Sequence, residues 1–240
     1  RLTTSRSGLQ NLNSDVRDTL TQEWVKLDLS SAQLAIAAKL WGVDSALEQL
    51  RSEESIWNSL KDRTGVEIKA PLKKGSYATV YGGKRSTIKG RMAYAAAKEG
   101  HPMDAEAQER FLSHPVISEL LEKREARLEE IRVNGGAEDC YDNPISTESI
   151  DDDSPERSVL SQLMQAREMQ LLTPALELAK EVEREYEVPP WEIMLYLYDG
   201  FLVKFNTPTE EYHIPRIQEA VNQRCEDLGY PTRLEIEVGT

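Results

Sequence analysis

Two aspartates stand at positions where one β-sheet could bring them together. Asp28 lies near the end of WVKLDLS (24–30), whose apolar–polar alternation predicts a half-buried strand. Asp199 precedes Gly200 inside YLYDGFLVKF (196–205), and an Asp-Gly pair between two apolar runs predicts a β-hairpin. Two carboxylates side by side could bridge two Mg²⁺ ions about 3.5–4 Å apart, as in-line phosphoryl transfer requires. Taken singly, each aspartate also fits a purely structural role, as a capping or a turn residue.

A basic segment without acidic residues runs from Lys69 to Arg91. Within it Lys69, Lys73, Tyr77 and Tyr81 are spaced by four residues, which places them on one face if the segment is helical. Such a row of lysines and aromatic rings could hold a triphosphate and stack a base. The same pattern also fits a solvated basic helix with two half-buried tyrosines.

Charge is distributed unevenly along the 240 residues. The net charge is −13, which argues against broad nucleic-acid binding because phosphate contacts need Lys and Arg. Much of the acidity is concentrated in residues 136–156, which we interpret as an exposed, mobile loop. The contrast with the basic segment favours one local cationic surface on an acidic protein.

No apolar run is long enough to span a membrane, and no signal-peptide pattern is present, which predicts a soluble, non-secreted protein without a membrane partner. The two cysteines are far apart, which fits a reducing compartment and indicates neither a disulfide nor a metal site.

The hydrophobic pattern predicts an α+β fold with one small antiparallel sheet and a mainly helical lobe. The expected strands are 24–30, two within 191–205, and 233–239. The expected helices are 31–41, helical stretches within 44–60, a helix that begins near Pro71 and ends at Gly82, 104–133 with a break at 113–115, 154–186 with a possible kink at Pro174, and 210–229.

Five segments, in the same order along the chain, resemble the motifs of family A DNA polymerases. RLTTSRSGLQNLN resembles TGRLSS…NLQN, and KLDLSSAQLAIAAKLWG resembles motif A. KAPLKKGSYATVYGG resembles motif B, R-x3-K-x3-[FY]-G-x2-YG. ERSVLSQLMQAREMQL resembles the R-x3-N-x3-Q helix, and LYLYDGFLVKF resembles motif C. Each match alone is weak, but their order across nearly the whole chain is specific.

The resemblance implies a DNA-directed DNA polymerase of the bacterial polymerase I or phage type, an enzyme of DNA replication. It implies that Asp28 and Asp199 bind two Mg²⁺ ions. It implies that Lys73 contacts the phosphates of the incoming nucleotide and that Tyr77 lies beside its sugar. It further implies that Tyr81, together with the glycine that follows it, lies near the templating base.

Further residues and partners are implied by the same resemblance. Gln33 and Lys69 would also contact the nucleotide. The residues implied to contact the primer–template or its neighbouring polar networks are Arg1, Gln10, Arg157 and Gln165. The implied partners are primer–template DNA, dNTPs and an upstream thumb or exonuclease segment or subunit, in the cytoplasm of a bacterial or phage-infected cell. The implied layout is a palm in 1–43 and 154–240 with fingers in 44–153.

The chain departs from the family pattern at several positions. Gln33 replaces a Glu that acts as a steric gate at the sugar, Lys69 replaces an Arg, and Ser161 replaces an Asn. Around Asp199, Tyr198 replaces a His and Gly200 replaces a Glu. These departures keep both aspartates. Two alternatives therefore stay open: a phage-type single-subunit RNA polymerase, and a non-catalytic polymerase-like binding subunit.

Overall fold

The computed structural model describes residues 12, 14–52, 55–197 and 199–237. The chain divides into two compact units, one formed by Arg1–Ala32 with Glu168–Thr240 and the other by Gln33–Arg167. The second unit therefore begins before, and ends after, the lobe expected at 44–153. Arg1, Gln10 and Tyr198 lie outside the described residues.

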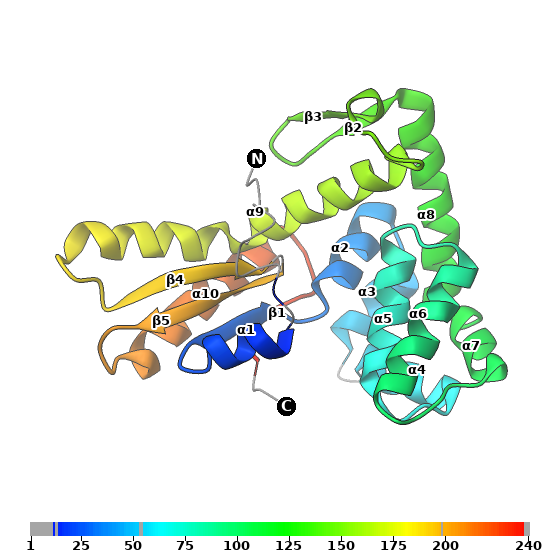
Figure 1. Ribbon diagram of the computed structural model, residues 1–240. Helices are drawn as coiled ribbons and strands as arrows, with labels where there is room; N and C mark the ends of the chain where they lie inside the picture. The colour runs from blue at the N-terminus through cyan, green and yellow to red at the C-terminus, as the bar shows by residue number, and fades with distance from the viewer. Residues whose placement is uncertain (1–11, 13, 53–54, 198, 238–240) are drawn as a thin grey trace. The chain divides into compact units, whose positions relative to one another are not determined.

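The first unit contains a four-stranded antiparallel sheet in the order β4-β5-β1-β6 (Figure 1). Its strands are β1 (Val25–Leu29), β4 (Trp191–Leu197), β5 (Gly200–Phe205) and β6 (Leu234–Ile236). All four were expected, β1 and β6 from their alternating patterns and β4 and β5 from the Asp-Gly hairpin signal, and the α+β fold class is confirmed.

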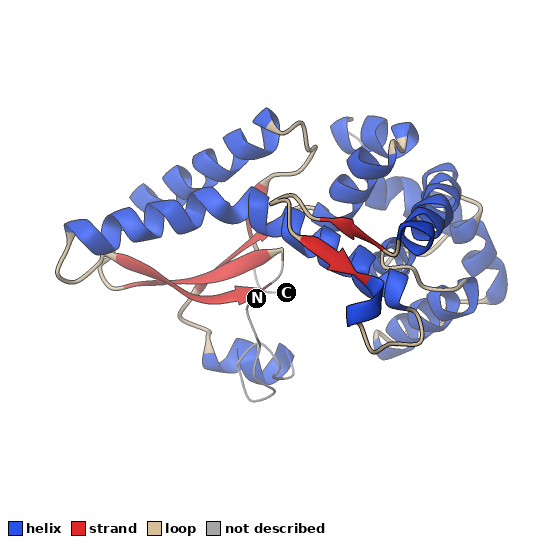
Figure 2. Ribbon diagram, turned by 90° about the horizontal axis from the view of Figure 1, so that it is seen from above, coloured by secondary structure: helices blue, strands red, loops and turns tan. Residues whose placement is uncertain are grey.

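One face of this sheet forms the core of the first unit. Leu27 and Leu29 of β1 share this face with Phe201 and Val203 of β5, and all four are buried. Within this unit, the part of α9 (Pro155–Glu185) that begins at Glu168 and α10 (Glu210–Asp227) lie along one side of the sheet (Figures 1 and 2). The long helix and the last helix were expected; α1 (Ser14–Leu20) was not.

The second unit is mainly helical. Its helices are the first part of α9 together with α2 (Ala32–Trp41), α3 (Asp44–Arg51), α4 (Ile56–Thr64), α5 (Lys69–Val80), α6 (Arg85–Lys98), α7 (Ala105–Leu112) and α8 (Pro115–Asn134). Helix α2 begins at Ala32, one residue before the first residue of this unit. Ser55 and Asp104 cap α4 and α7 by accepting hydrogen bonds from the backbone N–H groups of Trp57 and Ala107. The sequence interpretation missed α6.

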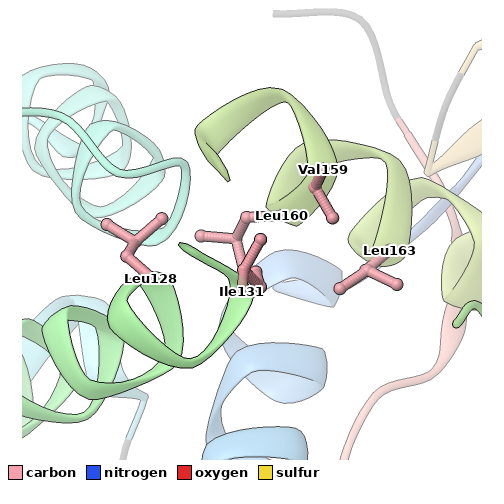
Figure 3. Packing of buried hydrophobic residues seen from close by; sticks show 5 residues of the cluster. All are labelled: Leu128, Ile131, Val159, Leu160 and Leu163. Carbon is pink, nitrogen blue, oxygen red and sulfur yellow. The ribbon is translucent and has the colours of Figure 1, made fainter. Parts of the chain in front are cut away.

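A hydrophobic cluster joins α8 to α9 inside the second unit (Figure 3). Its members are Leu128, Ile131, Val159, Leu160 and Leu163. The cluster anchors the first part of α9, which carries Arg157 and Gln165, onto the helical unit.

The acidic segment, expected as an exposed, mobile loop, is largely exposed but contains a short hairpin that the sequence interpretation did not predict. Strand β2 (Gly136–Glu138) pairs with β3 (Pro144–Ser146), and a 3₁₀ turn (Thr147–Ser149) follows. In the turn, Asp139 Oδ1 accepts hydrogen bonds from the backbone N–H groups of Tyr141 and Asn143 at 2.8 and 3.0 Å. Burial raises the pKa of Asp139, but these donors outweigh it and the pKa lies below its usual value.

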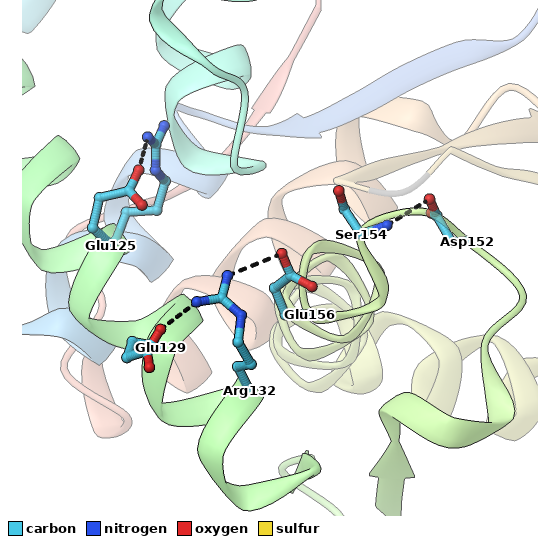
Figure 4. A network of polar contacts seen from close by, with 7 residues as sticks. Glu125, Glu129, Arg132, Asp152, Ser154 and Glu156 are labelled. Carbon is cyan, nitrogen blue, oxygen red and sulfur yellow. Dashed lines mark hydrogen bonds and ion pairs between the residues drawn. The ribbon is translucent and has the colours of Figure 1, made fainter.

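Apolar residues fasten this hairpin to the helical unit. Ala137, Ile145 and Ile150 pack against the cluster of α8 and α9. At the other end of the segment Arg132 contacts both Glu129 and Glu156, and Ser154 N donates to Asp152 Oδ1 (Figure 4). The sequence signal that was underweighted is Asp139 with Asn143, an Asx-type turn between short apolar stretches.

Among the described residues, none of the helices combines the length and the apolar composition needed to cross a membrane.

We expect Ile145→Ala to lower the free energy of unfolding by about 1 kcal/mol, because it removes a half-buried side chain from the cluster. Urea denaturation followed by circular dichroism measures the change. Val133→Ala is the matched control, since Val133 is 75% exposed near the end of α8. Equal unfolding free energies for both variants would mean that the hairpin does not stabilise this unit.

Candidate active site

Asp28 lies one residue before the end of β1, in the middle of the sheet. It pairs with Gly200 on β5 and with Glu235 on β6. Cross-strand partners project from the same face, so Asp28 lies on the face opposite Leu27 and Leu29. The buried face of β1 therefore determines which way the carboxylate of Asp28 points.

Because Gly200 has no side chain, the carboxylate of Asp28 can lie against its backbone. A Cβ atom at Gly200 would lie 2.3 Å from the Leu27 carbonyl oxygen and 2.7 Å from Asp28 Oδ1. Both distances are too short for any side chain, so only Gly fits at this position of the structure. The Asp28 carboxylate lies over the backbone of the hairpin at this position.

Asp199 occupies the turn between β4 and β5, and this turn is fastened to β1. The backbone N–H of Leu29 donates to the Asp199 carbonyl oxygen at 2.8 Å. Because Leu29 follows Asp28 directly, the bond places the backbone of the Asp199 turn at the end of β1 that carries Asp28. The expected combination of a strand end with a hairpin tip is thus present in the backbone.

Carboxylates are ligands that a hard cation such as Mg²⁺ prefers, so Asp28 and Asp199 are the candidate ligands at this end of the sheet. Mg²⁺ is usually held by one or two carboxylates together with water and substrate phosphates, so two aspartates are enough. Within the residues that the structure describes, no three Asp, Glu, His or Cys side chains are grouped closely enough to hold a metal ion. Glu235, which the sequence interpretation missed, is an exposed neighbour of Asp28 and does not complete such a group.

Side chains of α10 hold β6, which borders β1. Gln218 Nε2 donates to the Leu234 carbonyl oxygen at 3.0 Å, and Leu234 N donates to Asn222 Oδ1 at 2.7 Å. Next to it, Thr232 Oγ1 donates to the Ser30 carbonyl oxygen at 2.7 Å. These bonds fix the short edge strand against the segment that carries Asp28, although the strand has only three residues.

In the second unit, α5 presents the expected row of lysines and tyrosines on one face. Lys69 is exposed, Lys73 and Tyr77 are half-buried, and Tyr81 at the end of the helix is half-buried. The buried residues of α5 are Pro71, Leu72, Gly75, Ser76, Ala78, Thr79 and Val80. The row is therefore the face of α5 that the helical core leaves accessible.

Each lysine of this row lies over an aromatic ring. Lys73 Nζ is 5.4 Å from the centroid of the Tyr77 ring, and Lys69 Nζ is 5.0 Å from that of Trp57. A cation at this distance is attracted to the ring, which favours a defined position for a long, mobile side chain. Lys73 and Tyr77 thus act together as one cationic and aromatic surface.

Close packing fixes the position of α5 within its unit. A Cβ atom at Gly75 would lie 2.7 Å from Met92 Sδ on α6 and 2.9 Å from Phe111 Cζ on α7. A larger residue there would have to displace the buried side chains of Met92 and Phe111, so α5 packs closely against both helices. At the end of the helix Gly82 has φ of +76°, and its Cβ would lie 3.0 Å from Arg157 Cγ.

The other predicted residues are placed as follows. Gln33 lies on α2 and is only 3% exposed. Arg157, Ser161 and Gln165 follow one another every four residues on α9, and all are half-buried. The structure therefore assigns Asp28 and Asp199 to one unit, and the α5 row with Arg157 and Gln165 to the other.

No protein-family model and no curated protein sequence matches this chain. Among solved structures, it is similar to the POL domain of Pol1 from M. smegmatis in complex with DNA primer-template and dNTP. The TM-score is 0.69 at 15% sequence identity, over 100% of this chain and 45% of the other. The chain thus spans less than half the length of that protein, and it has the fold of part of a DNA polymerase domain.

We expect Gly200→Ala to destabilise the first unit by about 3 kcal/mol, because the new methyl group meets the Leu27 carbonyl and the Asp28 carboxylate. Thermal or urea denaturation measures the loss. Gly90→Ala is the control: nothing lies within 4 Å of a Cβ there, so in the interior of α6 it should stabilise by about 0.5–1 kcal/mol. Tolerance of alanine at Gly200 would contradict the close approach of Asp28.

Proposed function

We propose that this chain is the palm and fingers part of a family A DNA polymerase, of the bacterial polymerase I or phage type. The observation that carries the proposal is the fastening of the Asp199 turn to β1 beside Asp28, within a fold similar to a polymerase domain. The five motif resemblances, in family order, support the same assignment.

The proposed reaction extends a primer by one nucleotide directed by a template. The primer 3′ oxygen forms a bond to the α-phosphorus of a dNTP, the bond to pyrophosphate breaks, and the hydroxyl proton is lost to solvent. Asp28 and Asp199 would hold two Mg²⁺ ions by their carboxylates. When bound, these ions would lower the pKa of the attacking hydroxyl and stabilise the charge on the leaving group.

The α5 row binds the incoming nucleotide in this proposal. Lys73 neutralises charge on the phosphates, and its contact with the Tyr77 ring keeps the ammonium in place. Tyr77 lies beside the sugar, Tyr81 with the following glycine borders the templating base, and Lys69 adds positive charge. Gln33, on α2, takes part at the sugar by resemblance to the steric-gate position.

Because the chain carries a net charge of −13, DNA would bind only at local surfaces that present Lys, Arg or polar side chains. We propose that the Arg157 and Gln165 face of α9 contacts the primer–template, together with Arg1 and Gln10. The similar polymerase domain is more than twice as long as this chain, which supports a further segment or subunit that grips the duplex, such as a thumb.

Primer extension with dNTPs tests the proposal. Asp28→Asn and Asp199→Asn should each lower the rate at least about a thousandfold, because several kcal/mol of charge stabilisation are lost while the amide keeps the shape. Glu235→Gln is the control, since it removes a charge from the same face without removing a proposed ligand.

Three results would redirect the assignment. Extension by NTPs alone would favour a phage-type RNA polymerase. Binding of primer–template without extension would favour a non-catalytic subunit. Equal losses in all three variants would mean that general negative charge, and not a metal site at the two aspartates, supports activity.

The hydroxyl of Tyr77 should ease the incorporation of dideoxynucleotides. A terminator lacks the 3′ hydroxyl that helps to orient the phosphates, and a tyrosine hydroxyl beside the sugar can supply a replacement hydrogen bond. Such a bond contributes about 0.5–1.5 kcal/mol, and more to a charged partner. Tyr77→Phe should therefore strengthen discrimination against ddNTPs severalfold, measured as the ratio of dNTP to ddNTP incorporation. An unchanged ratio would place Tyr77 away from the sugar.

A further inference from the structure

A buried arginine from α8 binds the end of α5. Arg124 is 3% exposed, and its Nη1 donates to the carbonyl oxygens of Thr79 at 3.0 Å and of Gly83 at 2.9 Å. Its Nη2 contacts the carboxylate of Glu125, which reaches toward the guanidinium (Figure 4). The two partners, Thr79 on α5 and Gly83 just after it, lie 45 and 41 residues away in sequence, so this contact joins two distant segments.

The end of α5 is a Schellman turn. Gly83 N donates to the Ala78 carbonyl oxygen at 2.7 Å, and Gly82 N donates to that of Thr79 at 3.3 Å, with Gly82 at positive φ. The Thr79 carbonyl therefore accepts from both the turn and Arg124. Since the last carbonyls of a helix carry partial negative charge, a buried cation is favoured there.

A second arginine covers the same turn. The Cγ of Arg157, on α9, is 3.0 Å from the position of a Gly82 Cβ. The turn at Gly82 thus contacts Arg124 on α8 and Arg157 on α9. Burying a guanidinium costs free energy, and hydrogen bonds to the carbonyls of Thr79 and Gly83 offset this cost. Because both bonds form only when the turn is in this position, Arg124 favours this one position of the turn.

We infer that Arg124 is a positioning residue that fixes the end of α5 and, through it, the Tyr77 and Tyr81 surface. The inference rests on the proposed function of that surface in binding a nucleotide. Tyr81 N donates to the Tyr77 carbonyl oxygen at 2.9 Å in the turn that Arg124 holds, so a shift of the turn moves both rings. Arg124 itself is buried and acts only through α5.

The chain offers a matched control for this arginine. Arg110 on α7 donates through Nη2 to the carbonyl oxygen of Thr64, the last residue of α4, at 2.7 Å. Gly65 then ends α4 at positive φ, as Gly82 follows α5. Arg110 therefore makes the same kind of bond to the carbonyl at a helix end, at a more exposed position and at the end of α4 remote from Trp57.

The experiment compares Arg124→Met, Arg124→Lys and Arg110→Met by hydrogen exchange and by dNTP binding. Methionine keeps much of the volume but cannot donate, and lysine lacks the planar fork of arginine. We expect Arg124→Met to speed exchange of the Gly82 and Gly83 amides and to weaken dNTP binding about tenfold, because small misplacements of binding groups are costly. Arg124→Lys should show smaller changes than Arg124→Met in both amide exchange and dNTP binding. Arg110→Met should leave dNTP affinity within about twofold of that of the unaltered protein.

Equal weakening of dNTP binding by Arg124→Met and Arg110→Met would overturn the inference, because the effect would then be one of general stability. Faster exchange at Gly82 with unchanged dNTP binding would also overturn it. If the unaltered protein binds no dNTP, the proposed function fails and the nucleotide part of the inference fails with it. Hydrogen exchange would still decide separately whether Arg124 holds the turn.

Discussion

The hydrogen bond from Leu29 N to the Asp199 carbonyl is the constraint on which the candidate metal site depends. It ties the hairpin turn to the residue that follows Asp28, and it forms only because Gly200 lets the two backbones approach. A main-chain bond of this kind fixes the position of Asp199 without using its carboxylate. The backbone of the two aspartates is therefore positioned by a main-chain hydrogen bond and by the close approach at Gly200.

The α5 surface follows a related rule in the other unit. Contacts at the limit of packing at Gly75 and carbonyl bonds from Arg124 fix the helix from its buried side. On the accessible side, Lys73 and Tyr77 then position one another through the contact of the ammonium with the ring. In both units, a glycine allows a neighbouring segment to pack closely against the backbone. Hydrogen bonds to backbone carbonyls then hold the two segments in place.

Local patterns predicted the parts of this structure that depend on local geometry. The alternation around Asp28, the Asp-Gly pair at Asp199 and the four-residue spacing on α5 each determine a face or a turn within a few residues. The role of Arg124 was not predictable in this way. Arg124 binds carbonyls more than forty residues away, and no local sequence pattern indicates that pairing. Helix α6 was missed because its basic, weakly amphipathic sequence shows no clear apolar stripe. The acidic hairpin was missed because composition was given more weight than the turn chemistry of Asp139.

The acidic hairpin also bears on how an acidic chain could work on a polyanion. Asp139 accepts hydrogen bonds within its own turn, and Glu156 contacts Arg132, so part of the negative charge is engaged in holding the hairpin. The position that carries Glu in the related motif is Gly200 here, which removes one further negative charge beside Asp28. A site with fewer carboxylates repels a triphosphate less, while two carboxylates still suffice for Mg²⁺. In the proposed function, the net charge of −13 therefore restricts nucleotide and DNA binding to local positive surfaces, such as the face of α5 that carries Lys69 and Lys73.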